Sequence, residues 1–255
     1  MKIIAHRGAS AHAPENTLAA LRLALESGAD GVEFDVQLAR DGVPVVVHDE
    51  TLMRYARRRD RIVDLTSQQL GRIDVGSWFN RRHRRRGNTE FSRETIPTLA
   101  SVLDALKGLN GPVYIELKCN DTNFRRLSSA VCETVRDHPQ FEHLIVKSFK
   151  LAVIPEVRHH LPSVKTAALF APEIMHLLRR REHIIALAHE FGADQISVHH
   201  SLATPRLSRL ASEAGVPLVV WTVDDPRWLR RRRSHDLYAL ITNDPGRFVK
   251  SRQPS

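Results

Sequence analysis

The chain has 255 residues, of which 42% are hydrophobic and 26% are charged, an ordinary composition for a soluble globular protein with a substantial core. No apolar run approaches the length of a transmembrane helix, so no membrane-spanning helix is expected. The formal net charge of +9 indicates an anionic partner of some class without identifying it.

Most of the positive charge lies in runs of arginine with few aromatic residues between them. Such runs are usually solvated faces, and stacking on nucleic-acid bases needs interleaved aromatic rings. We therefore expect no specific nucleic-acid partner, although a positive field could draw in an anionic substrate or hold the protein near an anionic membrane. The runs occupy residues 57–59, 81–86 (interrupted by His83), 179–181 and 230–233.

The first predicted element is a short apolar strand at residues 3–6 that ends in the sequence His-Arg-Gly. Residues 1–5 are too short for the apolar core of a signal peptide, and removing such a segment would delete this strand. The two cysteines, Cys119 and Cys132, match no metal or redox spacing. We therefore expect a cytoplasmic protein whose thiols are reduced.

A predicted β-hairpin covers residues 31–50, GVEFDVQLARDGVPVVVHDE. Asp-Gly at 41–42, between two alternating apolar runs, is typical of a tight turn because Gly tolerates a positive φ. With a two-residue loop, paired residues have numbers that sum to 83, which predicts Asp35 opposite His48. Residues two apart share a face of a strand, so Glu33 is expected beside Asp35.

Helical patterns alternate with short strands along the rest of the chain, except in residues 50–95, where periodicity is lost and an insertion is expected. Eight strands alternating with eight helices require parallel strands and helical crossovers, which at this length indicate a closed barrel. A doubly wound open sheet competes with this fold, but no Gly-rich phosphate-binding turn follows the first strand. We predict a single α/β domain over residues 1–255, a (β/α)8 TIM barrel with a β-hairpin and a small insertion after the second strand. Further strands are predicted at 113–118, 143–148, 164–170, 195–198, 216–223 and 238–242. Helices are predicted at 14–27, 96–107, 124–135, 173–191, 204–215 and 225–233. A further helix follows the strand at 143–148 and runs to about residue 160, and a short helix closes the chain.

Catalytic groups of such barrels lie at the carboxyl ends of the strands. The polar residues expected there are His6, Arg7, Glu33, Asp35, Glu116, Lys118, Ser148, His199, Trp221 and Asp224, together with His48 from the hairpin.

Three of these residues, Glu33, Asp35 and Glu116, bring carboxylates together from neighbouring strands. Without a cation the cluster would repel itself, and one carboxylate would have to be protonated. Oxygen ligands suit Mg²⁺ or Ca²⁺ better than zinc. Each carboxylate could instead be merely paired with Arg7 or Lys118, but an E-x-D and an E-x-K motif on adjacent strands favour one divalent cation, Mg²⁺ or Ca²⁺.

Two histidines and two basic residues complete the predicted site. His6 and His48 suit general acid–base catalysis, although a lone barrel histidine is more often structural and only position distinguishes these two. Arg7 and Lys118 are fixed positive charges that could bind phosphate oxygens. The combination favours cleavage of a phosphodiester.

These residues lie in a series of motifs that resembles the glycerophosphodiester phosphodiesterases, most of all the compact bacterial cytosolic members. The resemblance runs from Ile3 to Pro245, and its HRG, E-x-D, HD and E-x-K elements are together highly specific. It implies a TIM barrel with a small insertion after the His48 arm. The motifs are, in order, IIAHRG, PENTLAA, VEFDVQLARDGVPVVVHD, VGSWF, IPTL, YIELK, KSF, ISVHH, WTVD and ITNDP.

The resemblance implies a role for each polar residue: metal ligation by Glu33, Asp35 and Glu116, acid–base catalysis by His6 and His48, and phosphate binding by Arg7 and Lys118. Glu15 and Asn16 of the PENT element would brace the site, the alternative being an acid and a cap at a helix N-terminus. Phe149 and Trp221 correspond to aromatic positions near the glycerol and alcohol side, although as isolated residues they would more often be core.

The implied reaction is metal-dependent hydrolysis of glycerophosphodiesters to sn-glycerol 3-phosphate and an alcohol. Attack by the substrate's own 2-hydroxyl, through a cyclic phosphate with the histidines exchanging roles, and direct attack by water both remain open. Alternative activities are a lysophospholipase D-like reaction and a lyase that stops at the cyclic phosphate. An alternative of another class is a non-catalytic barrel that binds nucleic acid or an anionic membrane, but the full set of catalytic residues speaks against it.

The sequence departs from the family pattern at two places. After Leu52 the family usually has a Thr/Asn/Gly-rich loop, whereas this chain continues MRYA and then with arginines. This arginine-rich rim predicts a preference for anionic or polyhydroxy alcohols, such as a phosphorylated group, glycerol or inositol. A proline often follows the E-x-K motif, and its replacement by Cys119 is expected to alter only the loop.

Overall fold

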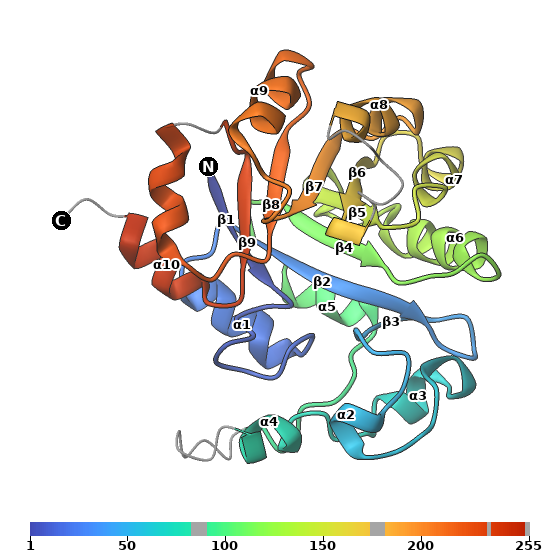
Figure 1. Cartoon of the computed structure of the whole chain (residues 1–255). Helices are drawn as coiled ribbons and strands as arrows, with labels where there is room; N and C mark the ends of the chain where they lie inside the picture. The colour runs from blue at the N-terminus through green and yellow to red at the C-terminus, as the bar shows by residue number, and fades with distance from the viewer. Residues whose placement is uncertain (83–90, 174–181, 234–235, 253–255) are drawn as a thin grey trace.

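The computed structural model describes residues 1–82, 91–173, 182–233 and 236–252, and these residues form the predicted barrel (Figure 1). The sheet closes because β1 pairs in parallel with both β2 and β9. The predicted (β/α)8 TIM barrel is therefore confirmed. Its eight parallel strands are β1 (Lys2–His6), β2 (Gly31–Leu38), β4 (Val113–Leu117), β5 (Leu144–Ser148), β6 (Lys165–Phe170), β7 (Gln195–His199), β8 (Leu218–Trp221) and β9 (Ala239–Thr242).

Helices on the outside of the barrel connect successive strands (Figure 1). In α6, Leu127, Val131 and Val135 recur every four residues and are fully buried, so one face of the helix covers the sheet. Residues 174–181 of the predicted helix 173–191 lie outside the described residues, and the predicted helix 225–233 is a 3₁₀ segment, η5 (Pro226–Arg233). The α-helices beside the strands are α1 (Leu18–Glu26), α5 (Leu99–Ala105), α6 (Phe124–Val135), α7 (Val153–His160), α8 (Glu182–Glu190), α9 (Pro205–Glu213) and α10 (Pro245–Arg252).

The hairpin of β2 and β3 (Pro44–Val46) differs by one residue from the predicted register. The pairs, such as Val36 with Val46, sum to 82, so Asp35 faces Val47 and the predicted Asp35–His48 pair is wrong. The cause is the turn, which has three residues between Ala39 and Val43 with Gly42 at φ +81°. His48 reaches the barrel mouth on the segment that follows β3.

Short helices beside the hairpin make up the described part of the predicted insertion. They enclose their own cluster of buried side chains, which includes Leu52, Tyr55, Ile62 and Leu70 and joins Val47 of the hairpin arm. The arginines at 84–86 and 179–181 lie outside the described residues. The short helices are α2 (Met53–Ala56), η1 (Ile62–Asp64), α3 (Ser67–Leu70) and α4 (Ser77–Arg82).

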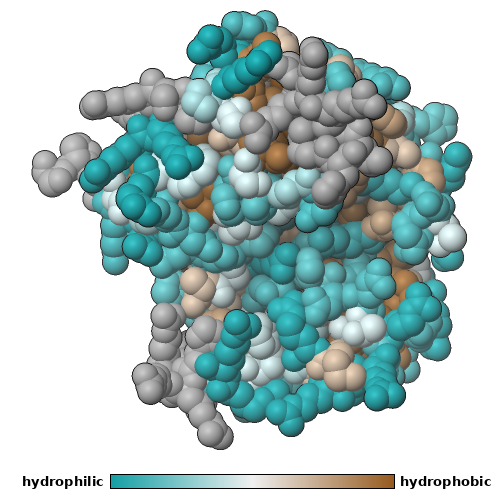
Figure 2. Space-filling model, in the orientation of Figure 1, coloured by the Kyte–Doolittle hydropathy of each residue, from teal (hydrophilic) through white to brown (hydrophobic). Residues whose placement is uncertain are grey.

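Alternation along β2 separates the apolar core from the polar interior of the barrel. Phe34 and Val36 pack in the layer between the sheet and the helices. Glu33 and Asp35 consequently point to the other side of the strand, toward the barrel interior. The face shown in Figure 2 is predominantly hydrophilic, with most hydrophobic side chains recessed. Within the described ranges, no helix has the length and apolarity needed to cross a bilayer.

Candidate active site

Three carboxylates meet inside the barrel where β2 and β4 lie side by side. Asp35 and Glu116 are register partners in the parallel pair, and Glu33 shares their face two residues earlier. Glu33 and Asp35 are fully buried, and Glu116 is 6% exposed. One carboxylate oxygen from each residue lies within 4.8 Å of the others. The structure therefore brings together the three predicted metal ligands.

Each carboxylate also lies beside a basic side chain. The close pairs are Arg7 Nε with Asp35 Oδ2 at 2.9 Å, Lys118 Nζ with Glu116 Oε1 at 2.7 Å and Lys147 Nζ with Glu33 Oε1 at 2.8 Å. Three positive charges thus compensate three negative charges at one buried point.

The basic side chains favour the ionised forms of Glu33 and Asp35. Burial alone would raise the pKa of Glu33, but Lys147 and His6 outweigh it and lower that pKa. Burial likewise opposes ionisation of Asp35, and the charges of Arg7 and Lys118 overcome it and lower its pKa. The expectation that one of the three carboxylates is protonated without a cation stays a prediction.

Lys147 is a part of the site that the sequence interpretation missed. Its side chain is 2% exposed, and Nζ lies 2.8 Å from Glu33 and 3.7 Å from Glu116. The available signal was a single lysine inside the apolar strand β5, because a fully buried lysine needs a partner.

The carboxylates retain coordinating capacity despite these ion pairs. Among the described residues, Glu33 Oε1, Asp35 Oδ1 and Glu116 Oε1 are buried and have no hydrogen-bond partner besides these ion pairs. Mg²⁺ and Ca²⁺ prefer oxygen ligands such as these carboxylates. A buried polar atom without a hydrogen bond also indicates a missing partner, such as an ion. The residues present therefore fit a hard divalent cation.

His6 ends β1 with its ring held by a residue from the opposite end of the chain. Asn243 Nδ2 donates to Asp224 at 2.7 Å, which turns Asn243 Oδ1 toward His6 Nδ1 at 2.7 Å. This network assigns the hydrogen of the neutral ring to Nδ1. The unprotonated Nε2 then faces the site, 3.9 Å from Glu33 Oε2. Asn243 was not singled out in the sequence, although the ITNDP motif contains it.

His48, like His6, carries its ring hydrogen on Nδ1, but a different partner holds it there. Its Nδ1 lies 2.8 Å from Asp49 Oδ1, and because an ionised carboxylate only accepts hydrogen bonds, Nδ1 is the donor. Arg54 donates to both oxygens of Asp49, from Nε at 2.7 Å and Nη2 at 2.8 Å. The geometry again leaves Nε2 of the imidazole without a hydrogen.

Glu15 connects the His48–Asp49 pair, through Arg54, to Arg7, which lies beside the Asp35 carboxylate. It accepts from Arg54 Nη2 at 2.7 Å and from Arg7 Nη1 at 2.9 Å. Arg7 and Arg54 are thereby bridged by one carboxylate.

Asn16 fixes the position of Asp35. Its Nδ2 donates to Asp35 Oδ2 at 2.9 Å, and its Oδ1 accepts from the Asp35 backbone N–H at 3.2 Å. Thr17 is the residue that caps α1, so the alternative interpretation of Asn16 as a helix cap is wrong. Arg7 and Asn16 both adopt positive φ, +55° and +60°, a conformation uncommon outside glycine and typical of functional sites.

Two aromatic residues lie together near Lys118. The rings of Phe149 and Trp221 meet edge to face at 5.5 Å, and Lys118 Nζ is 5.7 Å from the Phe149 centroid. Phe149 is 42% exposed and is therefore not a core residue. His199 joins this wall, with its ring 5.2 Å from Trp221. Ser148, in contrast, is buried and donates to the Leu117 carbonyl at 2.9 Å, so it braces β4.

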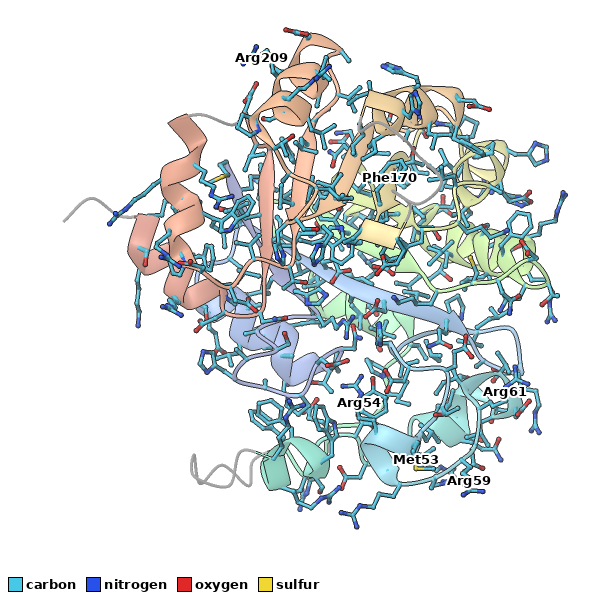
Figure 3. All side chains as sticks on the ribbon, viewed as in Figure 1. Met53, Arg54, Arg59, Arg61, Phe170 and Arg209 are labelled. Atoms are coloured by element: carbon cyan, nitrogen blue, oxygen red, sulfur yellow. The ribbon has the colours of Figure 1, made fainter. Side chains whose placement is uncertain are left out.

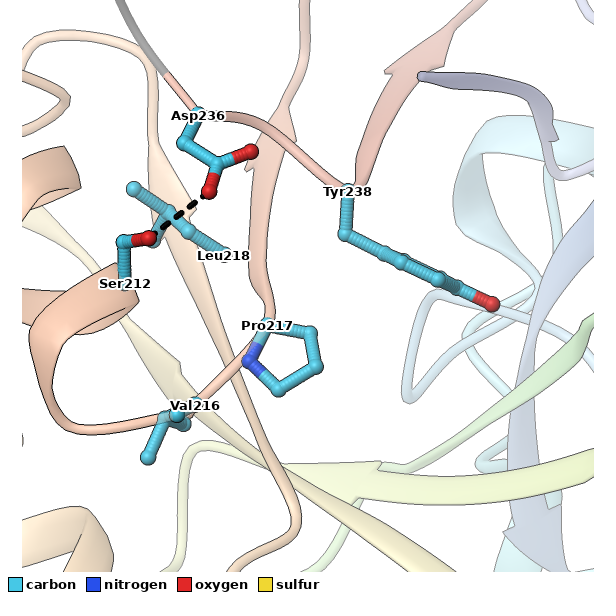
Figure 4. A pocket seen from close by; sticks show the side chains of 7 residues that line it. Ser212, Val216, Pro217, Leu218, Asp236 and Tyr238 are labelled. Carbon is cyan, nitrogen blue, oxygen red and sulfur yellow. Dashed lines mark hydrogen bonds between the residues drawn. The ribbon is translucent and has the colours of Figure 1, made fainter.

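A cavity of about 290 Å³ lies away from these residues, at the amino ends of β8 and β9 (Figure 4). Ser212 Oγ donates to Asp236 Oδ2 at 2.7 Å across it, and Tyr238 forms another part of its wall. In barrels of this type the amino-terminal face contributes stability and the opposite face carries chemistry. This cavity at the amino ends of the strands is therefore remote from the predicted catalytic groups.

Comparison with known proteins gives consistent matches over nearly the whole chain. The model of the Glycerophosphoryl diester phosphodiesterase family matches residues 6–247. Over 250 residues the chain is 30% identical to a glycerophosphodiester phosphodiesterase of Caldanaerobacter subterraneus subsp. tengcongensis, covering 97% of this chain and 96% of that protein.

Solved structures match equally broadly. A phosphodiesterase of Oleispira antarctica, in complex with the product sn-glycerol-3-phosphate, is 26% identical with a TM-score of 0.85, covering 98% of this chain and 96% of that one. A glycerophosphodiester phosphodiesterase of Agrobacterium tumefaciens is 28% identical with a TM-score of 0.79, covering 98% and 99% of the two chains.

Proposed function

The chain belongs to the glycerophosphoryl diester phosphodiesterase family, and from this premise we propose that it hydrolyses glycerophosphodiesters to sn-glycerol 3-phosphate and an alcohol. The observation that carries the proposal is the buried trio Glu33, Asp35 and Glu116 at the mouth that His6 and His48 also reach. The Oleispira antarctica relative, bound to sn-glycerol-3-phosphate, supports the proposed product.

Glu33, Asp35 and Glu116 would together hold one divalent cation, Mg²⁺ or Ca²⁺. When bound, the cation supplies a Lewis acid that withdraws charge from a phosphoryl oxygen. Arg7 and Lys118 bind the remaining phosphate oxygens and stabilise the negative charge that grows on them during cleavage.

His6 and His48 act as the acid–base pair. Nδ1 of each ring is held, by Asn243 in His6 and by Asp49 in His48, which leaves Nε2 for proton transfer. One imidazole removes a proton from the attacking hydroxyl, and the other protonates the leaving alcohol oxygen. The two exchange roles if the 2-hydroxyl of the substrate attacks first and water then opens a cyclic phosphate.

The deciding experiment is an assay of the purified protein on a panel of glycerophosphodiesters with Mg²⁺, with Ca²⁺ and with chelator, scoring glycerol 3-phosphate. We expect cation-stimulated release, and a loss of at least about 10²-fold in both His6→Ala and His48→Ala, with unchanged circular dichroism. A near-normal rate in either variant would remove that histidine from the acid–base role.

Phosphorus NMR of the products tests the alternatives. Accumulation of a cyclic phosphate would identify a lyase, and release from a lysophospholipid a lysophospholipase D-like enzyme. Absence of diesterase activity together with a steeply salt-dependent affinity for DNA would identify a binding protein.

A further inference from the structure

A cavity of about 460 Å³ opens directly beside two of the proposed catalytic groups, His48 and Lys118. One wall is the segment that follows β3, and the other is the loop between β4 and α6, which contributes Asn120 and Asn123. Gln37 stiffens the first wall, because its buried amide donates to the carbonyls of His48 and Asp49, both at 2.9 Å. The cavity is therefore a preformed extension of the site.

Several hydrogen-bond donors line this cavity, beside the carboxylates of Asp49 and Glu50. Asn120 Oδ1 accepts from Thr122, and Asn123 Oδ1 accepts from the Asn120 backbone, so each amide keeps its NH₂ group for another partner. Arg61 also lines the cavity, and within the described residues its guanidinium forms no ion pair.

Of the described arginines in the arginine-rich rim after Leu52, the structure places Arg61 at this cavity. The Arg54 guanidinium donates to Asp49 and Glu15, and Arg58 donates to Asp60 at 2.9 Å. Figure 3 shows Arg54 on the side of the insertion that faces the barrel and Arg59 on its far side. Among these arginines, Arg61 is the one that lines the cavity.

No aromatic ring other than the His48 imidazole lines the cavity. A quaternary ammonium group is bound best over aromatic faces, whereas a guanidinium with amide donors matches the oxygens of a carboxylate or phosphate. Glu50 is the one lining carboxylate without an ion pair in the described chain, and it would oppose such an anion.

We propose that this cavity holds the alcohol half of the substrate and that Arg61 selects alcohols carrying an anionic group over choline. The inference rests on the proposed function, since it places the leaving alcohol beside His48, beyond the phosphate bound at Lys118. Arg61 is a specificity-determining residue, and the bond cleaved is unchanged.

The test compares kcat/KM for glycerophosphoinositol 4-phosphate and glycerophosphocholine. Arg61→Gln should lower the value for the anionic substrate about tenfold and leave that for glycerophosphocholine within about twofold. Arg59→Gln is the matched control, since it removes the same charge from an exposed arginine two residues away, and it should leave both values unchanged. Glu50→Gln should raise the rate on the anionic substrate.

Equal losses on both substrates, an equal effect of Arg59→Gln, or a preference of the unaltered protein for glycerophosphocholine would overturn the inference. Inactivity of the unaltered protein on every glycerophosphodiester would instead overturn the proposed function. Arg61 is exposed and makes no side-chain ion pair among the described residues, so a thermal melt should find the variant folded.

Discussion

Nδ1 of His48 lies 2.8 Å from Oδ1 of Asp49, and the same carboxylate receives two hydrogen bonds from Arg54. Arg54 also donates to Glu15, which in turn accepts from Arg7. One connected set of ion pairs therefore holds both a proposed acid–base histidine and a proposed phosphate-binding arginine. Its central member belongs to the segment where the sequence departs from the family pattern.

Replacing Arg54 should impair turnover more than substrate binding. Arg54→Gln frees Asp49 to move away from His48, and we expect kcat to fall about tenfold with a smaller change in KM. Arg54→Lys should be intermediate, because an ammonium cannot make the two-pronged contact of a guanidinium. Steady-state kinetics measure both, with Arg58→Gln as the control at an exposed arginine. A kcat within about twofold of normal, with a lowered Tm, would reduce Arg54 to a structural role.

Asn243→Ala should slow the reaction without removing a group that touches substrate. The variant loses the acceptor that keeps the hydrogen of His6 on Nδ1, so the ring can adopt the other tautomer, and kcat should fall about tenfold. Ser10→Ala is the matched control, since Ser10 Oγ donates to the same Asn243 oxygen at 2.9 Å and leaves the His6 contact intact. Equal kinetics of the two variants would contradict the tautomer assignment.

Lys147→Met should destabilise the protein and make it depend on a cation. Removing one partner of a buried ion pair costs about 3 kcal/mol of unfolding free energy, because Glu33 then keeps an uncompensated charge. Mg²⁺ or Ca²⁺ should restore part of this loss, since the cation would compensate the same carboxylates. Urea titrations with chelator and with cation measure the effect.

Lys150→Met provides the control for Lys147, because Lys150 pairs with the exposed carboxylate of Asp121. A loss of at most about 1 kcal/mol is expected there. Equal losses in the two variants would contradict the special place of Lys147.

Glu116→Gln should weaken cation binding by at least about tenfold, because a neutral amide replaces one of three charged oxygen ligands. Isothermal titration with Mg²⁺ and Ca²⁺ measures the affinity, and the cation dependence of activity should move to higher concentration in parallel. An unchanged cation requirement would remove Glu116 from the ligand set.

The Asp49 carboxylate should contribute stability that is lost in acid. Burial opposes its ionisation, but the hydrogen bonds from Arg54 and His48 prevail and lower its pKa in the folded protein. A lowered folded-state pKa gives stability that is present above the unfolded value of about 3.9 and is lost as pH falls below it. Asp49→Asn should therefore reduce the fall in Tm between pH 5 and pH 3. Asp64→Asn, at an exposed carboxylate, should leave that fall unchanged.

The sequence by itself determined the barrel and the carboxylates of the site. Strict alternation of strands and helices leaves few folds available, and the two-residue period of a strand places Glu33 and Asp35 on one face whatever surrounds them. The motif resemblance is confirmed by the family match over residues 6–247. The hairpin register was wrong by one because a three-residue turn with Gly42 at positive φ uses the same Asp-Gly signal as a two-residue turn.

Tertiary structure alone decided how the site is braced. Asn243 contacts His6 across 237 positions of sequence because β9 closes against β1, and Lys147 meets Glu33 only because β5 is the second neighbour of β2 in the sheet. The pairing of Arg54 with Glu15 and Asp49, which leaves Arg61 as the cavity arginine, likewise depends on how the insertion packs against the first loop. Local periodicity carries no information about such contacts, because they depend on distances between segments that the chain brings together only when it folds.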